Sequence, residues 1–373
     1  MFKKFLYVLF WTSLVLSLKV HSATYYISNS GNDANDGLTD PSSWQTIDKI
    51  NSIEFANNDM ILFKRGEVFR GEISLFKSPI GITFGAYGTG TNPEIVGSVK
   101  ITGWIPTTHP ALSTNVYEAD VSGLPLTADG IHHLFVNGKL MTIARYPNVD
   151  SPDKINWLNV GATAGTNGFT DPALVAYGKP DGYWVGATLR IRNYSWTYTV
   201  TEVTSYTAST GQITASRLSN QLPEWGYFLD SKLEELDHPG EWYYDAGIKK
   251  VYLYPKGGIN PNTSLIEGST YDIGIKISSE NNTTIENLSF RHFTDKGVHI
   301  GGSNDCIVRN NYFEYNPTGL TAWNSANVII MSNTFNHQFN NSIGLSASSG
   351  FDVQNSIAEK IPLLILPSIR FMG

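Results

Sequence analysis

The pattern that decides the fold begins with Thr283-Thr284-Ile285-Glu286-Asn287-Leu288-Ser289-Phe290 and returns every 22 or 23 residues up to residue 358. Aligning the units gives an apolar column, a polar column and an aromatic column. Their members are Ile285, Val308, Ile330 and Val353; Asn287, Asn310, Ser332 and Asn355; and Phe290, Phe313 and Phe335. Each unit then reaches a glycine followed by an apolar residue. Short β-branched segments with such a period predict the coils of a parallel β-solenoid.

A solenoid buries its inward columns only when its coils stack, about 4.8 Å apart. We therefore expect the columns to form ladders, in which an inward Asn side chain bonds to the Asn one coil away. A leucine-rich repeat has a similar period, but it needs Leu at several fixed positions and a helical segment in each repeat. Asn, Ile and Phe occupy the columns instead. The sequence therefore predicts an all-β parallel β-helix.

The first residues predict export. Lys3 and Lys4 precede an apolar run at residues 5–18, and Ser22 and Ala23 are small residues suited to cleavage. We interpret residues 1–23 as a signal peptide, because the apolar run is shorter than the roughly 20 residues that span a membrane. The mature protein is expected to be secreted, periplasmic or on the cell surface, without a membrane span.

Composition excludes several kinds of partner and bond. A formal charge of −7 disfavours binding to nucleic acids by charge alone. The one cysteine, Cys306, excludes an intramolecular disulfide, and its place beside an apolar column predicts a buried side chain. Residues 29–37 are interpreted as a turn cluster, because Ala34 stands where an EF-hand loop would need a ligand. We expect no metal and no cofactor, and a monomer.

The repeat is interrupted in the middle of the chain. Asn137-Gly138 lies between short apolar segments and predicts a type I′ hairpin, and hence antiparallel strands that a parallel coil does not contain. Similar phrases flank the interruption at residues 95–98 and 266–269, as if the solenoid resumed where it paused. The predicted segments are the N-terminal cap and first coils at 24–99, an inserted antiparallel β-subdomain at 100–265, β-helix coils at 266–358, and a pattern-breaking tail at 359–373.

Several phrases resemble those of secreted bacterial right-handed β-helix proteins. They are residues 26–33, 64–71 and 86–90 in the first coils, and Ala144-Arg145-Tyr146-Pro147 and residues 237–245 in the insert. The insert phrases are similar to those of glycoside hydrolase family 141 and related carbohydrate-active enzymes. The resemblance implies a right-handed parallel β-helix that acts on a polysaccharide or oligosaccharide. It also implies catalytic carboxylates in later coils, so no catalytic residue is carried over onto this chain.

A glycosidase needs two carboxyl groups, and on a solenoid their separation follows from the coil spacing. The repeats from residue 283 onward show no stacked acids. Asp295 and His299 lie four residues apart around a corner and are the candidate catalytic residues, since such a pair can act as acid and base. The alternative is a solvated corner. Trp323, which lies outside the columns, and Glu314 are the candidate substrate contacts.

The last residues abandon the repeat. Residues 360–367 form an apolar segment with prolines, where the end of a solenoid needs a polar cap. We therefore expect a truncated chain that lacks its catalytic coils and has little or no activity. The leading function is hydrolysis of a complex plant or algal glycan. A polysaccharide lyase and a non-catalytic glycan-binding or surface protein are the alternatives.

Overall fold

The computed structural model describes residues 22–75, 79–149, 156–194 and 197–359. Nearly all of the segment interpreted as a signal peptide, and the tail from residue 360 onward, lie outside these residues. Within them the protein is almost entirely β, with the short helices α1 (Ile47–Asn51) and α2 (Pro172–Tyr177) and two 3₁₀ turns, η1 (Asp40–Ser42) and η2 (Leu233–Glu235). None of the described helices is long and apolar enough to cross a membrane.

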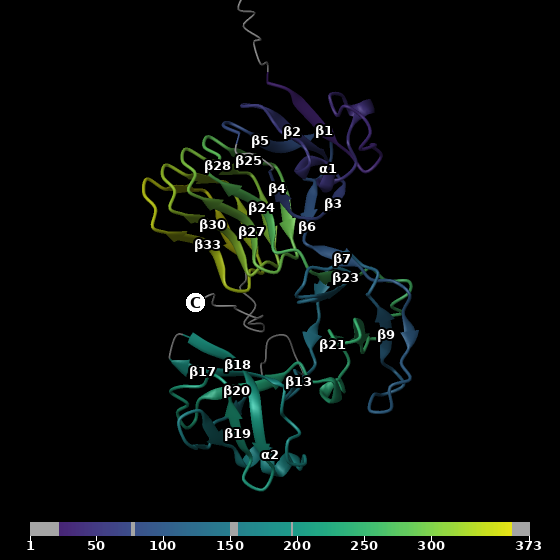
Figure 1. Ribbon diagram of the computed structural model, residues 1–373, viewed down its shortest axis with the longest axis vertical. Helices are drawn as coiled ribbons and strands as arrows, with labels where there is room; N and C mark the ends of the chain where they lie inside the picture. Colours follow the sequence, from purple (N-terminus) through teal and green to yellow (C-terminus); the bar gives the residue numbers. More distant parts are fainter. Residues whose placement is uncertain (1–21, 76–78, 150–155, 195–196, 360–373) are drawn as a thin grey trace, which may run out of the picture.

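Three parallel sheets surround one core and form the solenoid (Figure 1). Sheet A contains β1 (Thr24–Ile27), β2 (Met60–Lys64), β5 (Thr83–Tyr87), β25 (Thr284–Glu286), β28 (Ile307–Arg309), β31 (Ile329–Met331) and β34 (Asp352–Gln354). Sheet B contains β3 (Val68–Arg70), β6 (Glu94–Val96), β26 (Ser289–Arg291), β29 (Tyr312–Glu314), β32 (Thr334–Asn336) and β35 (Ile357–Glu359). Sheet C contains β4 (Ile73–Ser74), β24 (Ile273–Ser278), β27 (Lys296–Gly301), β30 (Thr318–Trp323) and β33 (Asn341–Ser346). From β2 onward each coil passes from A to B to C, which confirms the predicted parallel β-helix.

The apolar and aromatic columns of the repeat are ladders in the structure. The members of the apolar column, Ile285, Val308, Ile330 and Val353, pair in register across sheet A. In sheet B, the ring of Phe313 stacks between those of Phe290 and Phe335, with ring centroids 5.2 and 4.8 Å apart. Cys306 is buried in the same core, as predicted. These contacts confirm the register inferred from the repeat.

The side chains of the polar column were predicted to point into the core. This prediction is wrong, because the residue that follows each of them takes the inward position. Its members, Asn287, Asn310, Ser332 and Asn355, all have a positive φ, between 48° and 58°, and form the corner between sheets A and B. Asn adopts this left-handed conformation more readily than most residues, which is why it recurs there. The buried ladder is formed by the next residue. Asn333 Oδ1 accepts the backbone N–H of Asn311 (3.0 Å), and Asn311 Oδ1 accepts that of Leu288 (3.0 Å).

The other two corners of the coil repeat this arrangement. Between sheets B and C, Asn316 Oδ1 accepts the backbone N–H of Phe293 (3.1 Å). Between sheets C and A, Ser325 Oγ accepts the backbone N–H of Ser303 (3.2 Å), and Ser348 Oγ accepts that of Ser325 (3.0 Å). Each ladder thus supplies a partner for a backbone donor that would otherwise be buried unpaired.

The antiparallel insert leaves the solenoid after β6 and returns before β24. Its stem is the antiparallel pair of β7 (Ser98–Lys100) and β23 (Ile266–Ser269), and β10 (Leu134–Val136) pairs with the other edge of β23. The turn Asn137-Gly138, with φ of 50° and 74°, joins β10 to β11 (Lys139–Leu140), so the predicted hairpin is confirmed. Since β6 belongs to sheet B and β24 to sheet C, the insert occupies the corner between these sheets in one coil. Residues 100–265 remain our proposal for its extent.

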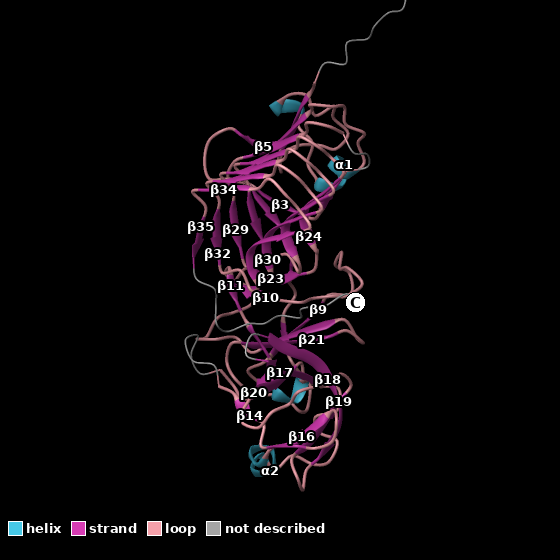
Figure 2. Cartoon of the chain, turned by 90° about the vertical axis from the view of Figure 1, so that its left-hand side faces the viewer, coloured by secondary structure: helices cyan, strands magenta, loops and turns pink. Residues whose placement is uncertain are grey.

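The rest of the insert forms two further sheets (Figure 2). One shares a core with the stem strands, and the other has a core of its own. The five-stranded sheet nearer the stem contains β8 (Ile105–Pro106), β9 (Tyr117–Asp120), β12 (Thr142–Ile143), β21 (Glu241–Asp245) and β22 (Lys250–Leu253). The eight-stranded distal sheet contains β13 (Arg145–Tyr146), β14 (Leu158–Asn159), β15 (Ala162–Thr163), β16 (Gly168–Thr170), β17 (Thr188–Tyr194), β18 (Thr197–Thr207), β19 (Gln212–Ala215) and β20 (Gly226–Asp230). Leu174 of α2 is buried in the distal core. The predicted antiparallel subdomain is therefore present.

The ladder in sheet A provides a test of the solenoid register. Replacing Ile330 with Asp places an unpaired carboxylate between Val308 and Val353, at a position with no exposed surface. We expect the free energy of unfolding to fall by about 4 kcal/mol or more. Met331→Asp is the matched control, because Met331 is the next residue in β31 and is only partly buried. Thermal denaturation checks the prediction, and equal melting temperatures for the two variants would contradict the register.

Candidate functional site

Three acidic residues lie where successive coils turn from sheet B into sheet C. Glu72 immediately precedes β4, Asp272 precedes β24 and Asp295 precedes β27. Pairing of β4 with β24, and of β24 with β27, places these residues on three consecutive coils. The backbone N–H groups of Asp295 and Lys296 both donate to the carbonyl oxygen of Asp272, at 3.1 and 3.0 Å. We call Glu72, Asp272 and Asp295 the acidic corner.

Sequence reasoning identified Asp295 but missed its two neighbours. Asp272-Ile273-Gly274-Ile275 precedes Asp295-Lys296-Gly297-Val298 by 23 residues, so the repeat itself carries the signal for Asp272. It was overlooked because the alignment of repeats began at residue 283, one segment too late. Glu72 gave no such signal, since the whole insert separates it from Asp272 in the sequence. The search of the repeats for stacked acids therefore could not find this corner.

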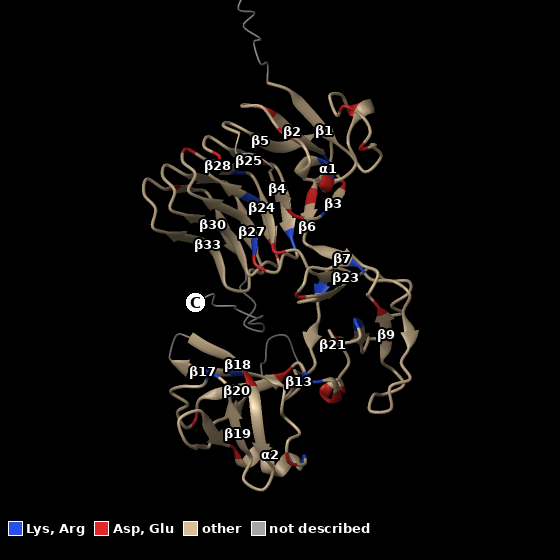
Figure 3. Ribbon diagram, in the orientation of Figure 1, with Lys and Arg blue, Asp and Glu red and all other residues tan. Residues whose placement is uncertain are grey.

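The acids of this corner have different surroundings. Partial burial of the Glu72 carboxyl, together with the negative charge of Asp272, raises its pKa, while the backbone N–H of Ile273 donates to its Oε2 (3.3 Å). Asp272 is exposed and accepts a hydrogen bond from the hydroxyl of Thr294. Asp295 forms an ion pair with Lys296. One carboxyl group is therefore biased toward its protonated form, next to two others that have partners for their charge. Figure 3 shows acidic and basic residues close together where β24 and β27 begin.

The outer face of sheet C carries His299 and Trp323. Val298 and Ile300 are buried in the core, so His299 and Gly301 point outward, as side chains alternate along a strand. His299 Nδ1 and the hydroxyl of Thr321, on the next coil, form a hydrogen bond of 2.8 Å. Burial lowers the pKa of His299, and the positive charge of Lys296 lowers it further. Trp323 pairs with Gly301 and is 59% exposed.

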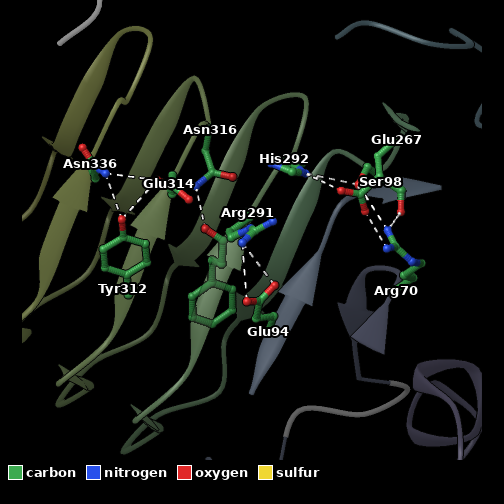
Figure 4. A network of polar contacts seen from close by, with 11 residues as sticks. Arg70, Glu94, Ser98, Glu267, Arg291, His292, Tyr312, Glu314, Asn316 and Asn336 are labelled. Carbon is green, nitrogen blue, oxygen red and sulfur yellow. Dashed lines mark hydrogen bonds and ion pairs between the residues drawn. The ribbon is translucent and has the colours of Figure 1, made fainter. Parts of the chain in front are cut away.

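Glu314 lies on a different face, the outer surface of sheet B (Figure 4). Its Oε1 accepts hydrogen bonds from the hydroxyl of Tyr312 (3.1 Å) and from Nδ2 of Asn336 on the next coil (3.0 Å). On the preceding coil, Arg291 forms an ion pair with Glu94, with an Nη1–Oε2 distance of 3.3 Å. The structure therefore brings Asp295, His299 and Trp323 onto one side of the solenoid and places Glu314 around the corner from them.

The stem of the insert packs against the same corner of the solenoid (Figure 4). Glu267 of β23 forms a largely buried ion pair with Arg70 of β3. The ring of His292 stacks on that of Phe135 in β10, with ring centroids 3.6 Å apart and planes inclined by 12°. Ser98 Oγ lies 3.3 Å from His292 Nδ1. These contacts fix the stem beside the segment that leads into Asp272.

Two buried imidazoles lie in this junction. His133 is 4% exposed, neither of its ring nitrogens has a hydrogen-bond partner, and it packs on Phe339. Burial lowers the pKa of His133 to about 3, and the charges of neighbouring basic groups act in the same direction. Burial likewise holds the pKa of His292 well below its usual value. Both side chains are therefore neutral at neutral pH.

Among the described residues, no group of three or more His, Cys, Asp or Glu side chains is arranged to hold a metal ion. The acidic corner is thus a set of ionisable groups spread over three coils, with Lys296 and His299 beside it. Such an arrangement is suited to proton transfer or nucleophilic attack at a bound molecule.

Comparison with known proteins supports the fold. A family model described as "Right handed beta helix region" matches residues 251–361, so the predicted right-handed β-helix stands. A search of curated proteins found no match. Among solved structures, one titled "Glycoside hydrolase" is similar with a TM-score of 0.67 and 17% sequence identity, over 87% of this chain and 67% of that one. At this level of identity the similarity concerns the fold.

Two further solved structures are more distant. One is titled "The complex structure of XylC with xylose", with a TM-score of 0.48 and 13% identity over 90% of this chain. The other is the GH136 lacto-N-biosidase from Eubacterium ramulus, with a TM-score of 0.38 and 12% identity over 91% of this chain. This chain spans 63% of the length of the first and 42% of the second.

The buried imidazole of His133 predicts a loss of stability in acid. The unfolded chain binds a proton as the pH falls below about 6.5, whereas the folded chain binds it only near pH 3. Stability is therefore fully present above pH 6.5 and is lost as the pH falls. Between pH 7 and pH 5 this one group should cost about 2 kcal/mol. His133→Phe keeps the packing on Phe339, so its melting temperature should fall less over this range; an equal fall would contradict the assignment.

Proposed function

We propose that this protein is a glycoside hydrolase that acts at the acidic corner on a plant or algal polysaccharide or oligosaccharide. The observation that carries the proposal is the position of Glu72 and Asp272 on adjacent coils in contrasting surroundings. A carboxyl group whose burial raises its pKa, next to a second carboxyl group, is the usual means by which one site supplies both an acid and a nucleophile. On this proposal the described coils carry an acid pair, so the proposal departs from our expectation, based on the repeats from residue 283 onward, of a chain with little or no activity.

Glu72 is the proposed proton donor to the leaving oxygen of the glycosidic bond, since burial and the charge of Asp272 favour its protonated form. Asp272 is the proposed nucleophile. One coil separates the two residues, and the pairing of Ile73 with Ile275 places Glu72 two residues further along its strand than Asp272. In glycosidases that retain the anomeric configuration, the carboxyl groups lie roughly 5 Å apart and the second carboxylate attacks the sugar directly.

The other candidates take supporting roles in this proposal. Asp295, which is ion-paired with Lys296, lies one coil beyond Asp272 and adds negative charge next to a developing oxocarbenium ion. His299 and Trp323 face the bound sugar chain from sheet C. Substrate contact by Glu314, on sheet B, remains a prediction. Membership of glycoside hydrolase family 141 and export after removal of residues 1–23 are the finer parts of the proposal, and both rest on the sequence phrases.

The proposal predicts turnover that depends on the two acids. We expect the 373-residue chain to release reducing sugar from at least one member of a panel of plant and algal polysaccharides. Glu72→Gln and Asp272→Asn should each lower the rate by about 10²- to 10⁴-fold, the usual contribution of a general acid or base. The wild-type rate should fall as the pH rises through the raised pKa of Glu72, and the Glu72→Gln variant should lose this limb. Reducing-end assays across pH check both statements.

Asp305→Asn is the matched control. Asp305 is an exposed acid at a corner of the same solenoid, and Asn tolerates its positive φ of 58°. Its activity should equal that of the wild type. Unsaturated products that absorb in the ultraviolet would instead indicate a lyase, and binding on a carbohydrate array without any release of reducing sugar would indicate a non-catalytic protein. Either result contradicts the hydrolase assignment.

A further inference from the structure

The exposed Trp323 lies far from the acidic corner, but on the same face of the solenoid. Asp295 stands at the start of β27, and Gly301 ends this strand six residues later, which corresponds to about 20 Å of extended chain. Trp323 is the partner of Gly301 on the next coil, β30. The distance from Asp295 to the indole ring is therefore set mainly by the length of a strand, and Asp272 lies one further coil away.

The surface between these two points carries polar side chains. Lys296, His299 and Thr321 face outward along β27 and β30, and His299 and Thr321 are joined by a hydrogen bond of 2.8 Å. Gly301, the partner of Trp323 on β27, has no side chain. An indole that is 59% exposed contributes little to the core, so one apolar ring face is free for contact with a ligand.

We infer that the substrate is an extended oligosaccharide that crosses sheet C from the start of β24 to the end of β30, with its scissile bond at Glu72 and Asp272 and a remote sugar stacked on Trp323. This inference rests on the proposed function. It adds that the substrate is an extended oligosaccharide and says how that oligosaccharide lies on sheet C. Sugar rings offer apolar faces to an aromatic ring and hydroxyl groups to the side chains between the two ends. A single sugar cannot reach both ends, so the site selects for chain length.

A substrate that lies along the solenoid axis, within one outward column of sheet C, has less support. Sheet C pairs Lys276 with His299, Thr321 and Gly344 in one outward column, and this column contains no exposed aromatic ring. Beyond Asp295, the corner continues with Pro317, which adds no carboxyl group. The exposed indole is thus displaced from the acids along the strand direction as well as between coils, with Asp272 two coils away from β30.

The test uses binding, so that it does not depend on turnover. The probes are size-fractionated xylo-, manno- and gluco-oligosaccharides from dimer to hexamer, titrated by calorimetry into the full chain carrying Asp272→Asn. For the series that binds, affinity should rise with length until the chain reaches Trp323 and then level off. Adding Trp323→Ala should remove this rise and weaken the hexamer about tenfold relative to the dimer. Trp323→Phe keeps a ring at this position and should restore most of the affinity.

The outcomes separate this inference from the proposed function. Affinity that is independent of length, a Trp323→Ala loss that is equal for dimer and hexamer, or no binding of any probe would each overturn the inference. Normal hydrolysis by Glu72→Gln and Asp272→Asn would overturn the catalytic assignment. If length-dependent binding through Trp323 persisted in that case, the sugar-binding row on sheet C would stand without the chemistry. If both acids proved essential and Trp323→Ala bound every length normally, only the inference would fail.

Discussion

Each coil of this protein buries backbone N–H groups at its corners, and the solenoid depends on side chains of the next coil to satisfy them. Asn311, Asn316 and Ser325 each supply an oxygen to a buried donor one coil earlier. Burial of an amide without a partner costs free energy comparable to a lost hydrogen bond. With these ladders in place, the chain can turn through left-handed corners and still close a dry core of Phe, Ile and Val side chains.

The same corners explain how the protein accommodates a large insert. The chain departs at Gly97, whose N–H donates to the carbonyl oxygen of Arg291 (2.9 Å), and on its return the N–H groups of Thr270 and Tyr271 both donate to the carbonyl oxygen of Gly97 (2.9 and 3.0 Å). The two ends of the insert therefore meet at one residue. The entropic cost of closing a loop between fixed ends rises only slowly with the length of the loop. A long insert therefore leaves the register of the coil unchanged. Thr127 of the insert also bonds to Thr270, two residues before Asp272, and thereby ties the insert to the acidic corner.

The core of the fold could be predicted from sequence, because its residues recur at a fixed spacing and share one property. Phe290, Phe313 and Phe335 align in the sequence and stack in space. Which of two corner residues points inward could not be predicted. Asn310 and Asn311 are neighbours of the same type, and only the backbone conformation distinguishes them. Of the candidate site, Asp295, His299 and Trp323 carried local signals. The relation of Glu72 to Asp272 did not, because it arises from strand pairing across the insert.

The corner ladders also have a direction. In every case above, the side chain on the later coil serves the backbone of the earlier coil, and the amide groups of Asn311, Asn316 and Asn333 likewise donate to carbonyl oxygens of the preceding coil. The buried corner amides of a coil therefore depend on the coil that follows it, whereas the exposed backbone N–H groups of Asn304 and Ala326 donate to Asn side chains of the preceding coil. Loss of one such Asn leaves donors and acceptors unpaired on the N-terminal side of the change, while the backbone donors of its own coil keep their partners from the next. Loss of a side chain from a buried corner ladder is thus felt by the backbone on its N-terminal side.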